Sequence, residues 1–307
     1  MRIGILGRER SGSENPLDDC VADARAAVAA GFATFWLPQA YGLDALTTLA
    51  VVGRSVEGIE LGTAVVPIYA RTPLALASAA LTTQAAVDGR FTLGIGLSHV
   101  TMVESVYGAS FDHPVRDLRE FLTVLAPLLR GEPVDFSGES VRVGGQVYVK
   151  NATPCSILVG ALGPQTLRVT GQLADGTITW VTGPQTLERH TIPTISDAAA
   201  RAERPEPRIV AGLPICVTAD PAAARERADH VFEIYGVLPS YRAMLDREGA
   251  QGPGDVAIVG DELAVRAQLE RLAEIGVTDF AASPFGTRDE QAATRAVLRA
   301  LSRPEPH

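Results

Sequence analysis

Three things are scarce in this chain of 307 residues: cysteine, lysine and long apolar runs. The three cysteines (Cys20, Cys155 and Cys216) are isolated and form no CxxC pair, so neither a disulfide framework nor a zinc site is indicated. Lys150 is the only lysine among 27 basic residues, which leaves almost no candidate for a Schiff-base or P-loop lysine. No apolar run reaches the ~18 residues of a membrane span, and the run at 2–6 is too short for a secretory signal. We therefore expect a cytoplasmic protein with no membrane partner.

Positive charge and metal-ligand clusters are missing as well. The formal net charge of −9 argues against nonspecific nucleic-acid binding, which needs a basic face. No histidine–carboxylate cluster has metal-ligand spacing, and no GxGxxG motif opens an early helix, so a metal site and a nicotinamide-binding Rossmann domain are both unsupported. What remains is the composition of a soluble globular protein, 46% hydrophobic and 21% charged, whose expected partner is a small-molecule substrate.

Short apolar runs alternate with helical stretches from one end of the chain to the other. The runs lie at 2–6, 32–37, 59–66, 91–96, 156–160, 177–181, 208–217 and 277–282. Helical patterns are found at 17–30, 44–56, 73–87, 115–130, 164–174, 185–202, 221–236 and 262–274. Eight strands alternating with helices over this length predict an α/β fold, a (β/α)8 TIM barrel, in preference to an open sheet. The loops that follow the strands then share one face, where the active sites of such barrels lie.

Longer segments interrupt the alternation, and we predict them to be insertions in a single domain formed by residues 1–307. Residues 131–153 mix glycines with β-formers and predict a hairpin before the fifth strand. Residues 237–260 are rich in glycine and proline and predict a helical excursion long enough to act as a lid. Together with the loop at 97–113, these segments would form most of the substrate pocket.

The most informative segment runs from an apolar strand into Gly160, Ala161, Leu162 and Gly163, and then into Pro164, where a helix can begin. Small residues let the backbone approach a ligand closely, and free amides at a helix start hold phosphate groups. This segment therefore predicts a phosphate-binding loop. The alternative is a tight turn that merely joins a strand to a helix.

Two neighbouring helices have almost no charge. No charged residue occurs between Arg71 and Asp88, and the helix at 44–53 has only Asp44 at its start. An outer helix of a lone barrel should show a polar stripe to water. We therefore predict a homodimer through helices 44–56 and 73–87. The alternative is that the inserted segments cover these helices.

The chain resembles the luciferase-like flavin and deazaflavin oxidoreductases, and more narrowly their coenzyme F420-dependent branch, known from actinobacteria and methanogens. The matching segments are 31–38 (GFATFWLP), 61–67 (LGTAVVP), 71–73 (RTP), 89–99 (GRFTLGIGLSH), 160–167 with 174–180, and 276–280 (GVTDF). The resemblance implies a TIM barrel with insertions, a tricyclic cofactor ring at its mouth and a helix-mediated dimer. It also implies a cis peptide bond between Ala64 and Val65, at a bulge that supports one face of the ring, and phosphate binding by the amides of 160–163.

Further candidates follow the strands. Gly96, Leu97, Ser98 and His99 end the fourth strand, where Gly96 and Ser98 could face the ring or its tail and His99 could donate a hydrogen bond to it. A lone histidine is as often structural.

Gln39 and Tyr41 follow the second strand, and Gln39 could bind a ring edge. Related sugar-phosphate dehydrogenases place an acid or histidine after the second strand and a glutamate after the strand-four glycines, whereas this chain has Gln39, Ala40 and Leu97 at the matching positions. This departure puts a sugar-phosphate substrate in doubt and removes the obvious proton donor. Trp180 and Phe285 end later strands and could line the substrate pocket with Tyr41, or belong to the core.

The leading hypothesis is a coenzyme F420-dependent oxidoreductase that transfers hydride between C5 of the deazaflavin and an organic molecule, with Gln39 and His99 as the only catalytic candidates. An FMN-dependent luciferase-like monooxygenase is the alternative, because both cofactors place a tricyclic ring and a phosphate in corresponding positions. A second alternative is a non-catalytic F420- or flavin-binding protein, since no carboxylate or histidine has a convincing catalytic position.

Overall fold

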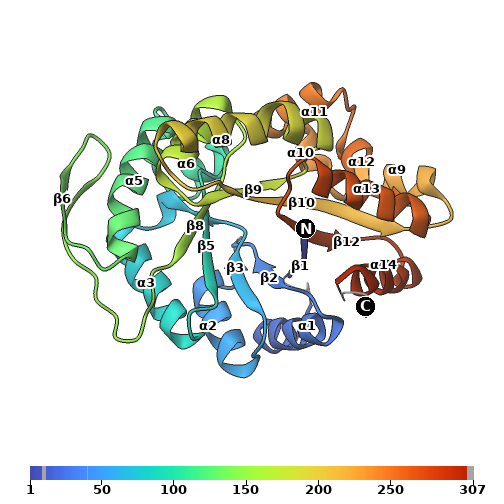
Figure 1. Ribbon diagram of the computed structural model, residues 1–307, viewed down its shortest axis with the longest axis horizontal. Helices are drawn as coiled ribbons and strands as arrows, with labels where there is room; N and C mark the ends of the chain where they lie inside the picture. The colour runs from blue at the N-terminus through green and yellow to red at the C-terminus, as the bar shows by residue number, and fades with distance from the viewer. Residues whose placement is uncertain (9–11, 40, 303–307) are drawn as a thin grey trace.

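The structure, a computed structural model, describes residues 1–8, 12–39 and 41–302. Its centre is a closed barrel of parallel strands (Figure 1), in which β10 pairs with both β9 and β12 and so completes the ring. The strands are β1 (Arg2–Leu6), β2 (Thr34–Leu37), β3 (Glu60–Thr63), β5 (Phe91–Gly96), β8 (Ser156–Gly160), β9 (Gly176–Trp180), β10 (Arg208–Val217) and β12 (Asp279–Pro284). The predicted eight-stranded TIM barrel is confirmed.

Two short strands extend the sheet beyond this ring. β4 (Val66–Pro67) pairs with β5 and follows a cis peptide bond between Ala64 and Val65, the isomer that the resemblance implies. The third predicted strand is therefore split in two. β11 (Ile258–Gly260) pairs with the end of β10 inside the segment that was predicted to be only helix and loop.

Helices surround the barrel (Figure 1). They are α1 (Pro16–Ala30), α2 (Ala45–Ser55), α3 (Pro73–Ala86), α5 (Pro114–Leu129), α6 (Pro164–Leu173), α8 (Ile192–Arg201), α9 (Pro221–Val231), α13 (Glu262–Glu274) and α14 (Arg288–Ser302). Local sequence explains many of their starts, because proline at the first position has no N–H to leave unpaired, and side chains such as Asn15 and Asp261 accept from the next amides.

Three helical predictions were wrong in part. The sequence analysis gave no helix after residue 282, where α14 lies. The predicted helix at 185–202 is a one-turn α7 (Pro184–Thr186), a π-helical turn η2 (Leu187–Thr191) and then α8. The predicted helix at 221–236 ends at Val231, and α10 (Glu233–Val237) follows after Phe232.

Apolar side chains fill the inside of the barrel. Trp36 from β2 is completely buried there, in one cluster with Leu158, Ile178 and Val210 from three other strands. The facing position on β3 is Gly62, where a Cβ atom would lie 2.2 Å from the indole ring. The large ring of Trp36 therefore fits because its neighbour has no side chain.

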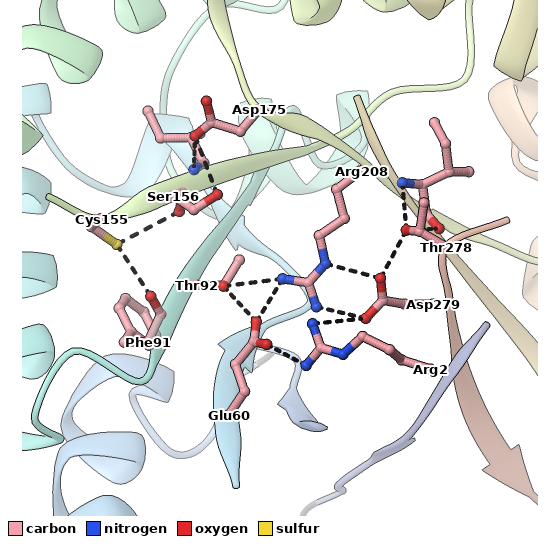
Figure 2. A network of polar contacts seen from close by, with 12 residues as sticks. Arg2, Glu60, Phe91, Thr92, Cys155, Ser156, Asp175, Arg208, Thr278 and Asp279 are labelled. Atoms are coloured by element: carbon pink, nitrogen blue, oxygen red, sulfur yellow. Dashed lines mark hydrogen bonds and ion pairs between the residues drawn. The ribbon is translucent and has the colours of Figure 1, made fainter. Parts of the chain in front are cut away.

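A network of ion pairs closes the amino end of the barrel, where the strands begin (Figure 2). Arg208 donates from Nε and Nη2 to the two carboxylate oxygens of Asp279, at 3.0 and 2.7 Å, and from Nη1 to Glu60 at 2.6 Å. Arg2 and Thr92 donate to the same Glu60 carboxylate. The guanidinium of Arg208 also lies 5.3 Å from the ring centre of Trp36, so it stacks under the barrel core.

In Figure 1 the hairpin segment lies at the left edge of the molecule, and the helices of the 237–260 segment lie at its upper right. Residues 131–153 contain an antiparallel hairpin of β6 (Val134–Ser137) and β7 (Arg142–Gly145), whose turn amides donate to the Glu120 carboxylate. The 97–113 loop carries α4 (Val100–Ser105). Residues 237–260 contain α11 (Pro239–Glu248) and α12 (Pro253–Val256) besides β11. That residues 1–307 form a single domain stays a prediction.

The exposed side chains of α3 are uncharged: Leu74, Ala75, Ser78 and Thr82 face outward. Val51 on α2 is likewise exposed. A homodimer through these helices stays a prediction, which the mass of the protein in solution would test. None of the helices among the described residues is long and apolar enough to cross a membrane.

Candidate active site at the carboxyl end of the barrel

The ends of four neighbouring strands bring several predicted residues together. Gln39 donates its backbone N–H to the carbonyl of Val65 at 3.4 Å, so the ends of β2 and β3 meet at the cis bond that follows half-buried Ala64. A Cβ atom on Gly96 would lie 2.6 Å from a methyl of Val65, and one on Gly160 would lie 3.5 Å from the other. Val65 therefore sits between the ends of β5 and β8, over two positions that have no side chain.

The side chains of Gln39 and Tyr41 contact residues outside these strand ends. The side-chain oxygen of Gln39 accepts from the N–H of Ala45, at the first residue of α2, so part of this side chain caps a helix. Tyr41 is 77% exposed, and its hydroxyl lies 2.7 Å from the sulfur of Met102 in α4. A pocket role for Tyr41 therefore depends on the 97–113 segment rather than on the barrel itself.

The loop after β5 turns sharply at the mouth. Leu97, Ser98 and His99 are each half-buried, and Ser98 adopts a positive φ of 61°, which a non-glycine residue seldom does. Burial lowers the pKa of His99 below its usual 6.5. Its imidazole is therefore neutral near pH 7, with one nitrogen able to donate a hydrogen bond and the other able to accept one.

The loop after β8 reaches α6 through the predicted small residues. Ala161 is buried, and Gly160, Leu162 and Gly163 are half-buried. Gly163 is the residue before the first turn of α6 and supplies no side-chain cap. His190, which the sequence analysis did not identify, lies with Nε2 2.9 Å from the carbonyl oxygen of Leu162. The η2 turn carries His190 toward this loop, and π-helical turns of this kind often mark functional sites.

The start of α7 repeats the start of α6 residue for residue: Gly163–Leu167 and Gly183–Leu187 both read GPQTL. In the second copy an anion is already in place. The carboxylate of Glu248 accepts from the N–H of Gln185 (3.1 Å), the N–H of Thr186 (2.7 Å) and the Thr186 hydroxyl (2.8 Å). In the first copy the Thr166 hydroxyl instead donates to the carbonyl of Gly163.

The two glycines differ in the same way. A Cβ atom on Gly183 would lie 2.3 Å from the Glu248 carboxyl carbon, whereas one on Gly163 would meet nothing closer than the Thr166 hydroxyl at 3.7 Å. The two copies thus share a sequence, but only the copy at Gly183 is filled by the protein's own carboxylate. The repeated pentapeptide is visible in the sequence, and it could have indicated Gln165 and Thr166 as candidate anion-binding residues.

A chain of aromatic rings reaches these loops; we call Trp180, Phe232, Tyr235, Tyr241 and Phe285 the aromatic wall. Successive ring centres are 4.9–5.9 Å apart, from Phe285 through Phe232, Trp180 and Tyr235 to Tyr241, and the Tyr241 ring lies 5.7 Å from that of His99. Burial raises the pKa values of Tyr235 and Tyr241, so both hydroxyls stay protonated.

Of the wall residues, Trp180 and Phe285 were predicted from the sequence and the other three were not. Trp180 is half-buried, but Phe285 is only 5% exposed and packs with Phe232 against α9 and β11. Phe285 therefore supports the wall from behind. The residue after Trp180, Val181, has a φ of 50°, an outlier for a β-branched residue, and such strain is concentrated at functional sites.

Two hollows lie outside this centre. One of about 620 Å³ is on the hairpin side, between the 68–73 turn, the 109–113 loop and residues 139–143. Another, of about 510 Å³, lies at the amino end next to Arg2, Glu60 and Arg208. Across the described parts of the chain, no group of three histidine, cysteine or acidic residues could hold a metal ion.

Comparison with known proteins identifies relatives over most of the chain. It is 27% identical over 301 residues to a 5,10-methylenetetrahydromethanopterin reductase of Methanolobus tindarius, covering 88% of this chain and 91% of that protein. A proposed coenzyme F420-dependent oxidoreductase of Mycobacterium tuberculosis is 32% identical over 216 residues, 65% of this chain and 62% of the relative. The structure of the coenzyme F420-dependent tetrahydromethanopterin reductase of Methanopyrus kandleri has the same fold, with a TM-score of 0.79, 22% identity and coverage of 96% and 97%.

Residues 1–292 match the protein family described as luciferase-like monooxygenase. This match includes the barrel strands, the cis peptide bond, the GPQTL pair and the aromatic wall. The chain therefore belongs to the luciferase-like monooxygenase family of oxidoreductases.

Proposed function

We propose that this chain binds coenzyme F420 at the carboxyl end of the barrel and transfers hydride between C5 of the deazaflavin and a small organic molecule. Family membership supports the reaction class, and the name of the Mycobacterium tuberculosis relative supports the cofactor. The observation that carries the proposal is the start of α6, which has no side-chain cap although its twin holds a carboxylate.

An anionic group such as the cofactor phosphate fits the start of α6. The N–H groups of Gln165 and Thr166 and the Thr166 hydroxyl correspond to the three donors that bind Glu248 in the twin. The positive end of the helix dipole adds a further attraction for an anion. We therefore assign the phosphate to the Gly160–Gly163 loop together with Gln165 and Thr166.

The ring is assigned to the neighbouring strand ends. Val65 would support one face, with Gly96 and Gly160 leaving room beside it. Leu97, Ser98 and neutral His99 would line an edge, where the imidazole can hydrogen-bond a ring carbonyl. When bound, the deazaflavin supplies a hydride donor or acceptor at C5. The chain's own task is then to hold the substrate near that carbon and to exclude water, which the aromatic wall suits because it is apolar.

A second candidate is an FMN-dependent monooxygenase, which the family description favours. FMN also carries a phosphate and a tricyclic ring, so the same residues would hold it. A third candidate is a cofactor-binding protein without catalysis, since none of the carboxylates and histidines among the described residues has a convincing catalytic position.

Equilibrium binding of oxidised coenzyme F420 and of FMN to the purified protein, followed by fluorescence, separates these readings. Selective binding of F420 supports the proposal and leads to a turnover screen of enones, imines and alcohols. Preference for FMN moves the protein to the monooxygenase reading. Tight binding with no turnover across the panel supports the non-catalytic reading, and failure to bind either cofactor overturns the assignment.

A further inference from the structure

We infer that Glu248 is a positioning residue for the substrate side of the site, because its carboxylate fixes α11 and thereby sets the aromatic wall over the barrel mouth. The inference rests on the proposed function for the statement that the wall faces a substrate. The link between Glu248 and the wall rests on contacts within this chain alone.

The first step concerns what holds α11 in place. Among the described residues, all hydrogen bonds between α11 and elements outside the 237–260 segment involve the start of α7. Glu248 accepts from Gln185 and Thr186, and the Thr186 hydroxyl also lies 3.2 Å from the carbonyl of Met244. Arg242, by contrast, bonds only within the excursion, to Asp246 and to the carbonyls of 250 and 251. The polar attachment of α11 to the barrel is therefore concentrated at Thr186 and Glu248.

The second step connects this attachment to the wall. Tyr241 lies in the first turn of α11 and Glu248 is the last residue of the same helix, so one rigid element joins them. Tyr241 packs on His99 at 5.7 Å and on Tyr235 at 4.9 Å, and Tyr235 packs on Trp180. A shift of α11 would therefore move the rings that face the mouth.

The third step is the fit at Gly183. Because any Cβ there would overlap the Glu248 carboxyl group, only glycine allows the carboxylate to reach the amides of α7. Gly183 has a φ of −73°, which alanine adopts freely, so Gly183→Ala displaces the carboxylate without changing the sequence of α11. Glu248→Ala removes the same contact from the other side, and the two variants should behave alike.

Tryptophan fluorescence reports the wall without any cofactor, since the chain has two tryptophans and Trp36 is enclosed in the barrel. In Glu248→Ala and Gly183→Ala we expect the emission of Trp180 to shift to longer wavelength and acrylamide to quench it more strongly. Both changes should vanish in a Trp180→Phe background. Asp246→Ala is the matched control, because Asp246 lies on the same helix and, among the described residues, its side chain accepts only from Arg242.

The link falls if both variants lower the melting temperature but leave Trp180 emission and quenching as in the parent protein, since Glu248 would then be a helix cap and nothing more. With a substrate from the turnover screen, we expect KM to rise about fivefold with kcat and F420 affinity nearly unchanged, the size of a lost helix cap. An unchanged KM would show that the position of the aromatic wall does not affect substrate binding. Failure of F420 to bind at all would overturn the proposed function and leave the fluorescence result standing.

Discussion

The two ends of the barrel are built from opposite chemistry. At the amino end, Arg208 is shared between Asp279 and Glu60, and every strong donor of its guanidinium has a carboxylate partner (Figure 2). The carboxyl end is instead formed by glycines, apolar residues and aromatic rings, with Val65 and Gly96 at its centre. The start of α6 keeps its backbone donors without a side-chain acceptor.

This difference separates stability from binding. A network whose charges are already paired has little capacity left to bind a ligand. When one member is removed, however, its partner remains as an unpaired buried charge, and this destabilises the fold. A mouth with spare donors and missing side chains contributes less to folding and can accept a ligand. Ser98 and Val181, which adopt a positive φ that costs energy, also lie there. The comparison predicts that mutations at the two ends affect different measurements.

The largest effect is expected for Arg208→Met, which leaves the nearly buried carboxylate of Asp279 and that of Glu60 without their main partner. Removing one partner of a buried ion pair costs about 3–5 kcal/mol. Urea unfolding should show this loss, while the F420 dissociation constant of the folded variant stays that of the parent. Arg130→Met is the control, because its pair with Glu132 is exposed to solvent and such pairs contribute little to stability.

If Arg208→Met does not fold, Arg208→Lys keeps the charge but cannot bond two carboxylates in the same fork geometry. It should be less stable than the parent and bind the cofactor equally well. A change in cofactor affinity without a change in stability, in either variant, would contradict the division between the two ends.

The next effect is expected at the carboxyl end, for Gly163→Ala. The new methyl group meets no atom of the protein closer than 3.7 Å, and a φ of −75° suits alanine, so the unfolding free energy should hardly change. A phosphate seated on the α6 amides would meet that methyl group, and we expect the dissociation constant for F420 to rise about tenfold, or ~1.4 kcal/mol. Fluorescence titration and urea unfolding measure the two quantities.

Gly144→Ala is the matched control for that variant. Gly144 lies in the β6–β7 hairpin, and a Cβ atom there would be 3.9 Å from the nearest atom. It should change neither stability nor cofactor affinity. Equal cofactor affinity in both alanine variants would contradict the assignment of the phosphate to the start of α6.

The sequence predicted the architecture because the evidence for it is local. Apolar runs and helical stretches alternate within short windows, and small residues at 160–163 and proline at 164 stand where the β8–α6 loop and the helix start are found. The missed parts depend on contacts between distant residues. Arg208 lies 148 residues from Glu60 and 71 from Asp279, and no spacing rule connects them.

The aromatic wall was missed for a similar reason. Trp180 and Phe285 were recognisable because they lie at the ends of barrel strands, but Tyr235 and Tyr241 lie in short helices with no strand to place them. Glu248 is an ordinary exposed-helix residue by sequence and acquires its role only when α11 reaches α7. The identical GPQTL segments show the limit of local reasoning, since one copy is filled and the other is open for reasons that lie elsewhere in the chain.

The smallest expected effect is on the pH dependence of the unfolding free energy, which again differs between the two ends. Burial alone would raise the pKa of Glu60, but the charge of Arg208 and hydrogen bonds from Arg208, Arg2 and Thr92 outweigh it and hold the pKa below the usual 4.5. The folded state therefore gains stability from ionised Glu60 above pH 4.5 and loses it as the pH falls through the lowered value. The difference in unfolding free energy between the parent protein and Glu60→Gln should accordingly shrink as the pH falls below about 4.5.

At the carboxyl end, stability changes in a higher pH range. Burial lowers the pKa of His99 below 6.5, so the unfolded chain takes up a proton before the folded chain does, and stability falls as the pH drops from 6.5 toward the folded value. Urea unfolding of His99→Gln should lack this loss between pH 7 and 5.5, where Glu60→Gln follows the parent protein. If the two variants show the same pH dependence, the ends of the barrel do not titrate separately.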